Sequence, residues 1–429
     1  MKKWVLLAVV SFFLQYSGLC QLRRDEIYSD FVLYNKRERL NKDLRENIIS
    51  KTFAQKLDSN NEHKFESACK AISQFMIAND DVEKGFEQLF DQYQFLPYPT
   101  RRAFLEAVYG VYPTGYNINM KAILEKETDP KLFAMSALYL FRADSSVENV
   151  NSIKIRMVEQ FPGYDSINIL SAFESYLNQH AGFRQHKTPD ISHLFAHQQT
   201  HGKKIIYSFQ RWNRDYPGLA IVQNADGRFM RNEGGRLVVF QQLARSASDL
   251  PYFITNGSTP QGIYSIQGTA IAHNNYIGPT PNLQLVMPYE KDWQKYFHQP
   301  TASTLDSLQL YKQLLPSTWQ NYLPMAEAWT AGKIGRTEII AHGTTIDPEY
   351  FKDKPYYPLT PTMGCLCAKE VWNITSGRLL VSEQFNLVST YTATPGQKGF
   401  LYVINIDDQQ KPVSREEMER WVNSFEKRR

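Results

Sequence analysis

The sequence predicts an α+β multidomain chain, in which an all-helical N-terminal domain precedes a mainly β domain that carries a helical insertion. Its 429 residues allow two to three domains of ordinary size. Hydrophobic residues make up 42% of the chain, which is enough for a substantial core. Up to about residue 201, apolar residues recur at helical spacing, whereas short β-branched and aromatic runs between turn residues follow residue 202.

The first twenty residues have the order of an export signal. Lys2 and Lys3 precede an apolar stretch from Trp4 to Leu14, and a short polar segment leads to Cys20. The apolar stretch is about half the length that a bilayer-spanning helix needs, and no longer one follows, so we expect no transmembrane segment. The residues before Cys20 are in the wrong order for a lipid-attachment site. We therefore predict cleavage near Gln21, with residues 1–20 as a signal peptide.

Residues 21–201 are predicted to form the helical domain. Between Lys64 and Ala78 the apolar residues form one helical stripe. The segments 130–142, 147–160 and 167–179 follow the same pattern, and Asp129 before Pro130 is a favourable N-cap. No fixed repeat is evident, so we expect either a helical packing module or a module that binds a protein partner.

Residues 202–429 are predicted to form the mainly β domain. The runs Lys203–Phe209, Gly218–Val222 and Arg236–Phe240 are expected to be strands. Helical spacing returns at about 290–332, which predicts an insertion on the sheet, and again at about 414–427, which predicts a C-terminal helix.

The surroundings of a row of histidines argue against a metal ion as a ligand, and the charge balance argues against nucleic acid. His193, His197 and His201 recur every fourth residue, a spacing that can bind zinc. No glutamate lies between the first two and no ligand cluster follows, so we expect an ordinary helix, no metal site and no cofactor. Lys plus Arg number 48 against 44 Asp plus Glu, and both signs are interspersed, so nucleic acid is not an expected partner.

One cysteine and one histidine form a candidate catalytic pair. Cys365 follows Gly364 and lies 23 residues after His342. A cysteine needs a base and a lowered pKa to act as a nucleophile, and a nearby imidazole supplies both. A glycine before the cysteine permits a tight turn whose amides can bind an oxyanion. The alternative is an inert, buried cysteine.

Four motifs in order resemble the L,D-transpeptidase (YkuD-type) catalytic domain family. They are Ser258–Ile266, Leu285–Tyr289, Ile339–Thr344 and Thr362–Cys365, and the resemblance covers roughly residues 203–407. It implies a sandwich-like, mainly β catalytic domain that acts on peptidoglycan stem peptides. In that family, a thiolate forms a thioester at diaminopimelate and passes the acyl group to an amine acceptor.

The resemblance also implies a role for each motif residue. Cys365 matches the nucleophile and His342 the general base, while the backbone carbonyl of Gly343 matches the group that orients the histidine. The amides of Gly364 and Cys365 match the oxyanion hole, and Thr362 matches the position that supports the turn.

The sequence departs from the family pattern at two positions. Met363 stands where the family usually has a histidine, and Cys367 where it usually has an arginine or asparagine. Because of Cys367, the residue that would bind the substrate carboxylate is not identified by the motif. Arg336 and Lys369 are candidates for it. The substrate-binding candidates are Thr362, Met363, Cys367, Tyr357 and Arg336, with Tyr357 in a longer aromatic loop. Cys367 also allows a disulfide with Cys69, the alternative being a packed free thiol.

Together these features predict an exported, peptidoglycan-modifying cysteine acyltransferase in the periplasm or cell envelope of a bacterium. Two alternatives remain open. The same Cys-His site would serve an L,D-carboxypeptidase or endopeptidase if water were the acceptor. A catalytically inactive, wall-binding scaffold is the second alternative, since a fold can lose its activity.

Overall fold

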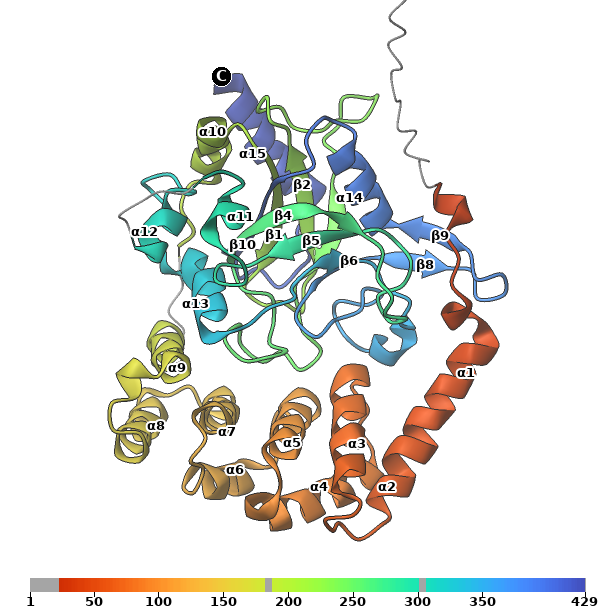
Figure 1. The fold of residues 1–429 in the computed structure, drawn as a ribbon, viewed down its shortest axis with the longest axis vertical. Coiled ribbons are helices and arrows are strands. Elements are labelled where there is room, and N and C mark those ends of the chain that lie inside the picture. Colours follow the sequence, from red (N-terminus) through yellow and green to blue (C-terminus); the bar gives the residue numbers. More distant parts are fainter. Residues whose placement is uncertain (1–22, 182–186, 301–305, 429) are drawn as a thin grey trace, which may run out of the picture.

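The computed structural model describes residues 23–181, 187–300 and 306–428 and shows an arc of helices beneath a barrel of strands (Figure 1). The predicted signal peptide, residues 1–20, lies outside the described residues. Within the described part of the chain, no helix is both long and apolar enough to cross a membrane.

The prediction of a helical N-terminal domain is confirmed. Its helices are α1 (Tyr34–Lys42), η3 (Asp43–Ser50), α2 (Lys51–Phe53), α3 (Glu62–Phe75), α4 (Asp80–Gln92), α5 (Tyr98–Val111), α6 (Asn117–Leu124), α7 (Pro130–Ala143), α8 (Val147–Gln160) and α9 (Asn168–His180). The predicted segments correspond to α3, α7, α8 and α9. The Asp129 side chain caps α7 by accepting hydrogen bonds from the backbone N–H groups of Lys131 and Leu132.

The helices form two rows, of which α3, α5, α7 and α9 face the barrel while α2, α4, α6 and α8 lie on the outside (Figure 1). The hydrophobic core of the arc continues into the C-terminal half. Leu243, Leu250, Phe253, Ile254 and Phe351 of that half belong to the same buried cluster as the helices. The two predicted domains therefore share one core, and the inner face of the arc is already occupied.

The C-terminal half is a closed, mixed barrel, so the prediction of a sandwich-like domain is wrong. The strands follow the order β1-β10-β4-β5-β6-β7-β3-β2 and close on themselves. Their bounds are β1 (Lys204–Arg211), β2 (Gly218–Gln223), β3 (Phe240–Leu243), β4 (Gly262–Ala270), β5 (Asn282–Val286), β6 (Ala341–His342), β7 (Leu366–Ala368) and β10 (Gly399–Asp407). Closure depends on the very short strands β6, β7 and β3, which bridge what would otherwise be two sheet edges.

Helices cover the barrel outside and at one end. The outer cluster includes α10 (Ile191–His201), α11 (Trp293–Phe297), α12 (Ser307–Lys312) and α15 (Arg415–Arg428). The inner cluster combines strand residues with three residues of α14 (Glu383–Thr392). α11, α12 and α13 (Glu327–Ile334) lie in the predicted insertion. The predicted strand Arg236–Phe240 is displaced, because β3 begins only at Phe240.

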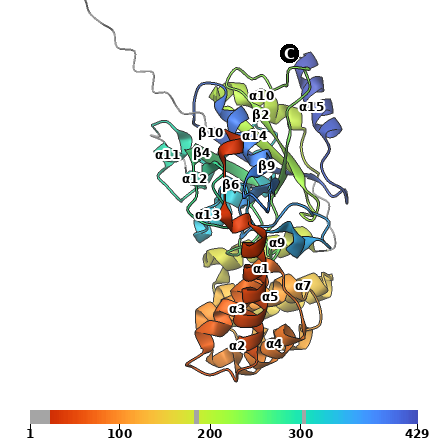
Figure 2. The ribbon, with the colours of Figure 1, turned by 90° about the vertical axis from the view of Figure 1, so that its right-hand side faces the viewer.

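The N-terminal segment runs from the arc to a small hairpin beside the barrel, as the side view shows (Figure 2). This hairpin consists of β8 (Glu370–Trp372) and β9 (Leu379–Ser382). The backbone N–H groups of Ser29 and Leu379 donate across the contact to Gly377 and Ile27. The Trp372 indole in turn donates to the carbonyl of Thr344 at 2.8 Å, which ties the hairpin to the chain just after β6.

Candidate active site

The predicted pair lies on neighbouring parallel strands. His342 ends β6, Cys365 directly precedes β7, and the register pairs Ala341 with Leu366 and His342 with Cys367. Cys365 therefore lies opposite Ile340, two residues before His342 along the ladder. Because side chains alternate between the two faces of a sheet, positions two apart along a ladder lie on the same face. The fold thus brings together two residues that the sequence separates.

The imidazole of His342 is held in a defined tautomer. Its Nδ1 is hydrogen-bonded to the carbonyl oxygen of Gly343, so Nδ1 carries the proton and Nε2 is left as an acceptor. The side chain is buried, and this burial lowers the pKa of His342 to about 4. The imidazole is therefore neutral at physiological pH, which is the state that a general base requires.

A buried carboxylate that the sequence did not reveal supports this arrangement. Glu370 accepts hydrogen bonds from the Thr344 backbone N–H at 2.9 Å and from the Ser382 hydroxyl at 2.7 Å. Its carboxyl group packs directly on the Cα of Gly343, where an added Cβ would lie 2.1 to 2.4 Å from the carboxyl atoms. Burial raises the pKa of Glu370 to about 7. Glu370 thus fixes the backbone that presents the Gly343 carbonyl to His342.

Replacing Gly343 with alanine is therefore expected to destabilise the protein by roughly 1–3 kcal/mol, the usual cost of overpacking a buried site. The new methyl group must displace either the Glu370 carboxyl or the backbone that orients His342. Urea denaturation measures the change in the free energy of unfolding. Gly234→Ala is the control, because the nearest atom to a Cβ there, Oδ1 of Asn232, is 3.5 Å away. Equal stability of the two variants would contradict this account of Gly343.

The thiol of Cys365 is half-buried and protonated in this state. Its Sγ accepts the Ile340 N–H at 3.5 Å and donates to the Glu338 carbonyl at 3.6 Å. Among the described residues, no hydrogen bond joins it to His342. Burial raises the pKa of Cys365, and Arg336 partly offsets this rise. For this pair to react, the thiol would have to leave the Glu338 carbonyl and turn to Nε2 of His342, a movement compatible with catalytic hydrogen bonds that form only with substrate bound.

The turn before Cys365 offers one backbone amide for an oxyanion. Gly364 has a φ of 116°, a conformation that favours glycine. Its N–H donates to the Thr362 hydroxyl at 3.0 Å, and that hydroxyl donates to the Cys365 carbonyl at 2.8 Å. Thr362 therefore supports the turn, and the Gly364 amide is already engaged. Over the ranges that the structure describes, the Cys365 N–H meets no acceptor, so it is the amide left for this role.

Arg336 places a positive charge beside Cys365. Its buried guanidinium donates to the backbone carbonyls of Tyr252, Gly257 and Ser258, the last two at 2.9 and 3.2 Å. A Cβ at Gly364 would lie 2.5 Å from its Nη2, so this nitrogen packs on the turn. Burial lowers the pKa of Arg336 to about 10, which leaves it charged at neutral pH. It therefore favours the thiolate of Cys365.

The helical arc holds the loop that positions Arg336. Glu106 on α5 accepts two hydrogen bonds from the side-chain amide of Asn256, at 3.0 and 3.1 Å. Lys131 on α7 donates to the Thr255 hydroxyl at 3.1 Å. Thr255 and Asn256 are the two residues before Gly257, whose carbonyl accepts a hydrogen bond from Arg336. These contacts span more than a hundred residues of sequence, and no local signal reveals them.

Three other predicted residues contribute less to this cluster. Tyr357 is exposed and donates to Glu349 at 2.9 Å, on the surface. Met363 is partly buried in the turn, and the buried Cys367 lies opposite His342. Cys69, Cys365 and Cys367 are all free thiols, so the suggested disulfide between Cys69 and Cys367 is wrong.

The histidine row lies on α10 and packs on the insertion. His193 is hydrogen-bonded to Thr318 at 3.0 Å, and His197 to the Gln313 carbonyl at 3.1 Å. The described residues contain no group of three or more histidine, cysteine or acidic side chains that could hold a metal ion.

Comparisons of the chain with protein-family models, with curated proteins and with solved structures found no match. The resemblance to L,D-transpeptidases therefore depends on the four sequence motifs alone, and the chemistry of the site must be argued from its geometry.

Proposed function

We propose that this protein is a cysteine acyltransferase in which Cys365 is the nucleophile and His342 the general base. One observation carries the proposal. A neutral imidazole, whose Nε2 has no hydrogen-bond partner among the described residues, lies on the strand that runs parallel to the one entered by the cysteine. The cationic Arg336 beside the thiol and the unoccupied Cys365 amide add to it, because both favour the negative charges that form during acyl transfer.

The reaction follows from these groups. His342 takes the proton of the thiol, and the thiolate attacks a peptide carbonyl carbon. The resulting oxyanion accepts a hydrogen bond from the Cys365 N–H and is stabilised electrostatically by the positive charge of Arg336. The C–N bond then breaks, His342 returns the proton to the leaving amine, and a thioester remains. A second amine attacks the thioester and regenerates the thiol, or water does so in the hydrolase alternative.

The substrate class comes from the motif resemblance, which supports peptidoglycan stem peptides with diaminopimelate as the acyl donor. The predicted signal peptide supports export to the periplasm or cell envelope of a bacterium, where such peptides occur. Met363 and Cys367 depart from the family pattern. Arg336, which is held by three backbone carbonyls, acts in this proposal on the thiolate and the oxyanion.

Intact-protein mass spectrometry with a diaminopimelate tetrapeptide tests the proposal. We expect the mass to rise by that of the tripeptide acyl group while D-alanine is released, and a carbapenem to add its whole mass by ring opening. Protein pretreated with iodoacetamide is the control and should show neither change. A second stem peptide should yield a crosslinked product, whereas the free tripeptide as the sole product would indicate the hydrolase. The absence of any adduct at either donor would favour the inactive scaffold.

A further inference from the structure

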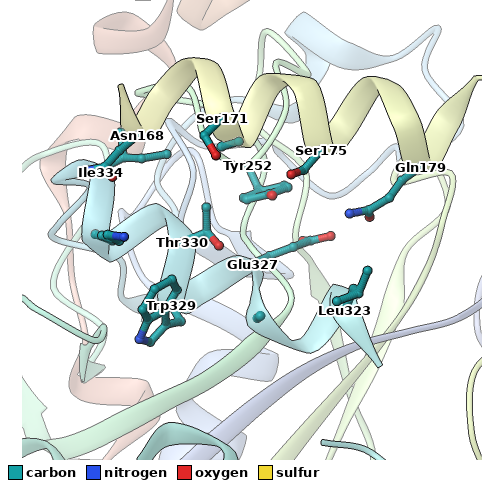
Figure 3. Close-up of a pocket in the computed structure, with 13 residues that line it drawn as sticks. Asn168, Ser171, Ser175, Gln179, Tyr252, Leu323, Glu327, Trp329, Thr330 and Ile334 are labelled. Carbon is teal, nitrogen blue, oxygen red and sulfur yellow. The ribbon is translucent and has the colours of Figure 1, made fainter. Parts of the chain in front are cut away.

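A separate cavity lies between the helical arc and the insertion on the barrel. It has a volume of about 210 Å³ and is enclosed by α9 on one side and by α13 with the residues before it on the other (Figure 3). Drug-sized ligands occupy cavities of roughly 300–1,000 Å³, so this one suits a smaller molecule. It involves neither Cys365 nor His342, and its interpretation does not depend on the proposed function.

The two helices face each other with polar side chains. Asn168, Ser171, Ser175 and Gln179 form one face of α9, and Glu327, Thr330 and Lys333 line the opposite wall from α13. Figure 3 shows these α9 side chains directed toward those of α13. Helix faces that meet at an interior contact are usually apolar. No hydrogen bond between described residues joins the two faces, so their donors and acceptors are available to a polar molecule in the gap.

Glu327 gives the cavity a carboxylate that forms no ion pair with the residues that the structure describes. Its carboxylate accepts the backbone N–H of Gln261 at 2.8 Å and the side-chain amide of Gln261 at 3.1 Å. The charge of Arg214 acts on this carboxylate through space, but the Arg214 guanidinium donates its hydrogen bonds to the carbonyls of Ala244 and Thr259. Within the described part of the chain, no ion pair includes Glu327. Burial raises the pKa of Glu327 to about 7, as expected for such a carboxylate.

A positive charge lies further along the same helix. The ammonium group of Lys333 lies 5.2 Å from the centre of the Trp329 ring, and both residues line the cavity. Lys333 follows Glu327 by six positions on the α-helix, which is a rise of about 9 Å along the axis. The ends of a dipeptide are about 6–7 Å apart, whereas a single amino acid carries both charges on one carbon. Flexible side chains can close the remaining distance for the dipeptide.

We propose that this cavity binds a small zwitterionic peptide, a dipeptide in size, with its amine at Glu327 and its carboxylate at Lys333. The hydroxyl and amide side chains of α9 form hydrogen bonds with the peptide bond of the ligand. Only the zwitterion satisfies both ends of the site.

Isothermal titration calorimetry with alanylalanine tests the proposal on the full chain. We expect binding to weaken at least tenfold when the peptide is N-acetylated, and again when its carboxylate is amidated. Affinity should be greatest near pH 7.5. Below that, Glu327 becomes protonated, and above about pH 8 the peptide amine loses its charge. Arg214 stays charged because a guanidinium does not lose its proton in proteins. Burial keeps Tyr252, Tyr311 and Tyr322 neutral over this range.

Amino-acid substitutions test whether the peptide binds in this cavity. Ser175→Leu fills the space and should abolish binding, whereas Asn178→Leu should not, because the native Asn178 side chain accepts a hydrogen bond from Lys154 and is not among the residues that line the cavity. Lys333→Gln, at an exposed position, should remove the preference for the free carboxylate over the amide, and Glu327→Gln the preference for the free amine. No heat of binding at millimolar dipeptide, or binding retained in Ser175→Leu, would overturn the proposal.

Discussion

Replacing Cys365 with alanine is expected to abolish covalent labelling by a tetrapeptide or a carbapenem, a loss of at least about 1,000-fold in rate. No other thiol of the described residues can substitute. Cys69 and Cys367 are fully buried, and burial raises the pKa of both, that of Cys367 to about 12. Time-resolved intact-mass measurement of wild type and variant checks the result. The variant should fold, because Cys365 is only half-buried.

The matched control is Cys69→Ala. Cys69 belongs to the core of the helical arc, so its truncation lowers the free energy of unfolding without touching the site. Labelling of this variant should proceed at the wild-type rate. If Cys365→Ala still acquired the adduct, peptide mapping would identify the true nucleophile, and the proposed function would be wrong.

The helical half could be predicted because its signals are local. The apolar stripe of α3 and the N-cap and proline of α7 lie within single segments, and they carry their structural meaning regardless of the rest of the chain. Helix periodicity survives in isolation, since residues three and four apart share a face. The same reasoning recovered β1 and β2, which are long and rich in β-branched or aromatic residues.

Closure of the barrel could not be predicted for the opposite reason. β6 has two residues and β7 three, too few for an alternating pattern, and each pairs with strands far away in the sequence. The short parallel pair that β6 and β7 form joins two sheet edges and closes the barrel. Such pairings depend on tertiary contacts, which neither composition nor periodicity records.

Part of the candidate site could be predicted from the sequence, because the proposed chemistry requires particular residue types. Cysteine, histidine and glycine in this order are rare enough to notice, and Arg336 was among the candidates for a cationic role. Glu370 and Glu106 were missed, since a buried acidic residue looks like any surface glutamate in a sequence. Their importance comes from burial and from partners such as Ser382 and Asn256, which only the fold places beside them.

Contacts of this kind give the helical arc a role in supporting the candidate site. Through Glu106 and Lys131 it holds the loop whose carbonyls hold Arg336. The inner helices thus belong to the support of the site. The outer row, α2, α4, α6 and α8, is the part of the arc that remains accessible to the protein partner suggested by the sequence (Figure 1).

Replacing His342 with alanine is expected to slow acylation by about 100- to 10,000-fold, the usual contribution of a positioned base. Wild type should also show a distinctive pH profile. Because the pKa of His342 is lowered to about 4, the imidazole stays neutral from pH 7 down to pH 5. The acylation rate should therefore stay level over this range instead of falling with a midpoint near 6.5, as it would for an exposed histidine.

Stopped-flow acylation by a carbapenem between pH 4 and pH 8 measures this profile, with circular dichroism to show that the protein remains folded. His273→Ala, at an exposed position, is the control and should leave the rate and the profile unchanged. Glu370→Gln is measured alongside, because burial raises the pKa of Glu370 to about 7. A loss of rate centred near pH 6.5 that persists in this variant would mean that an ordinary, solvated histidine is the base. An unchanged rate in His342→Ala would mean that the thiol of Cys365 is activated by another group, of which the neighbouring Arg336 is the first to test.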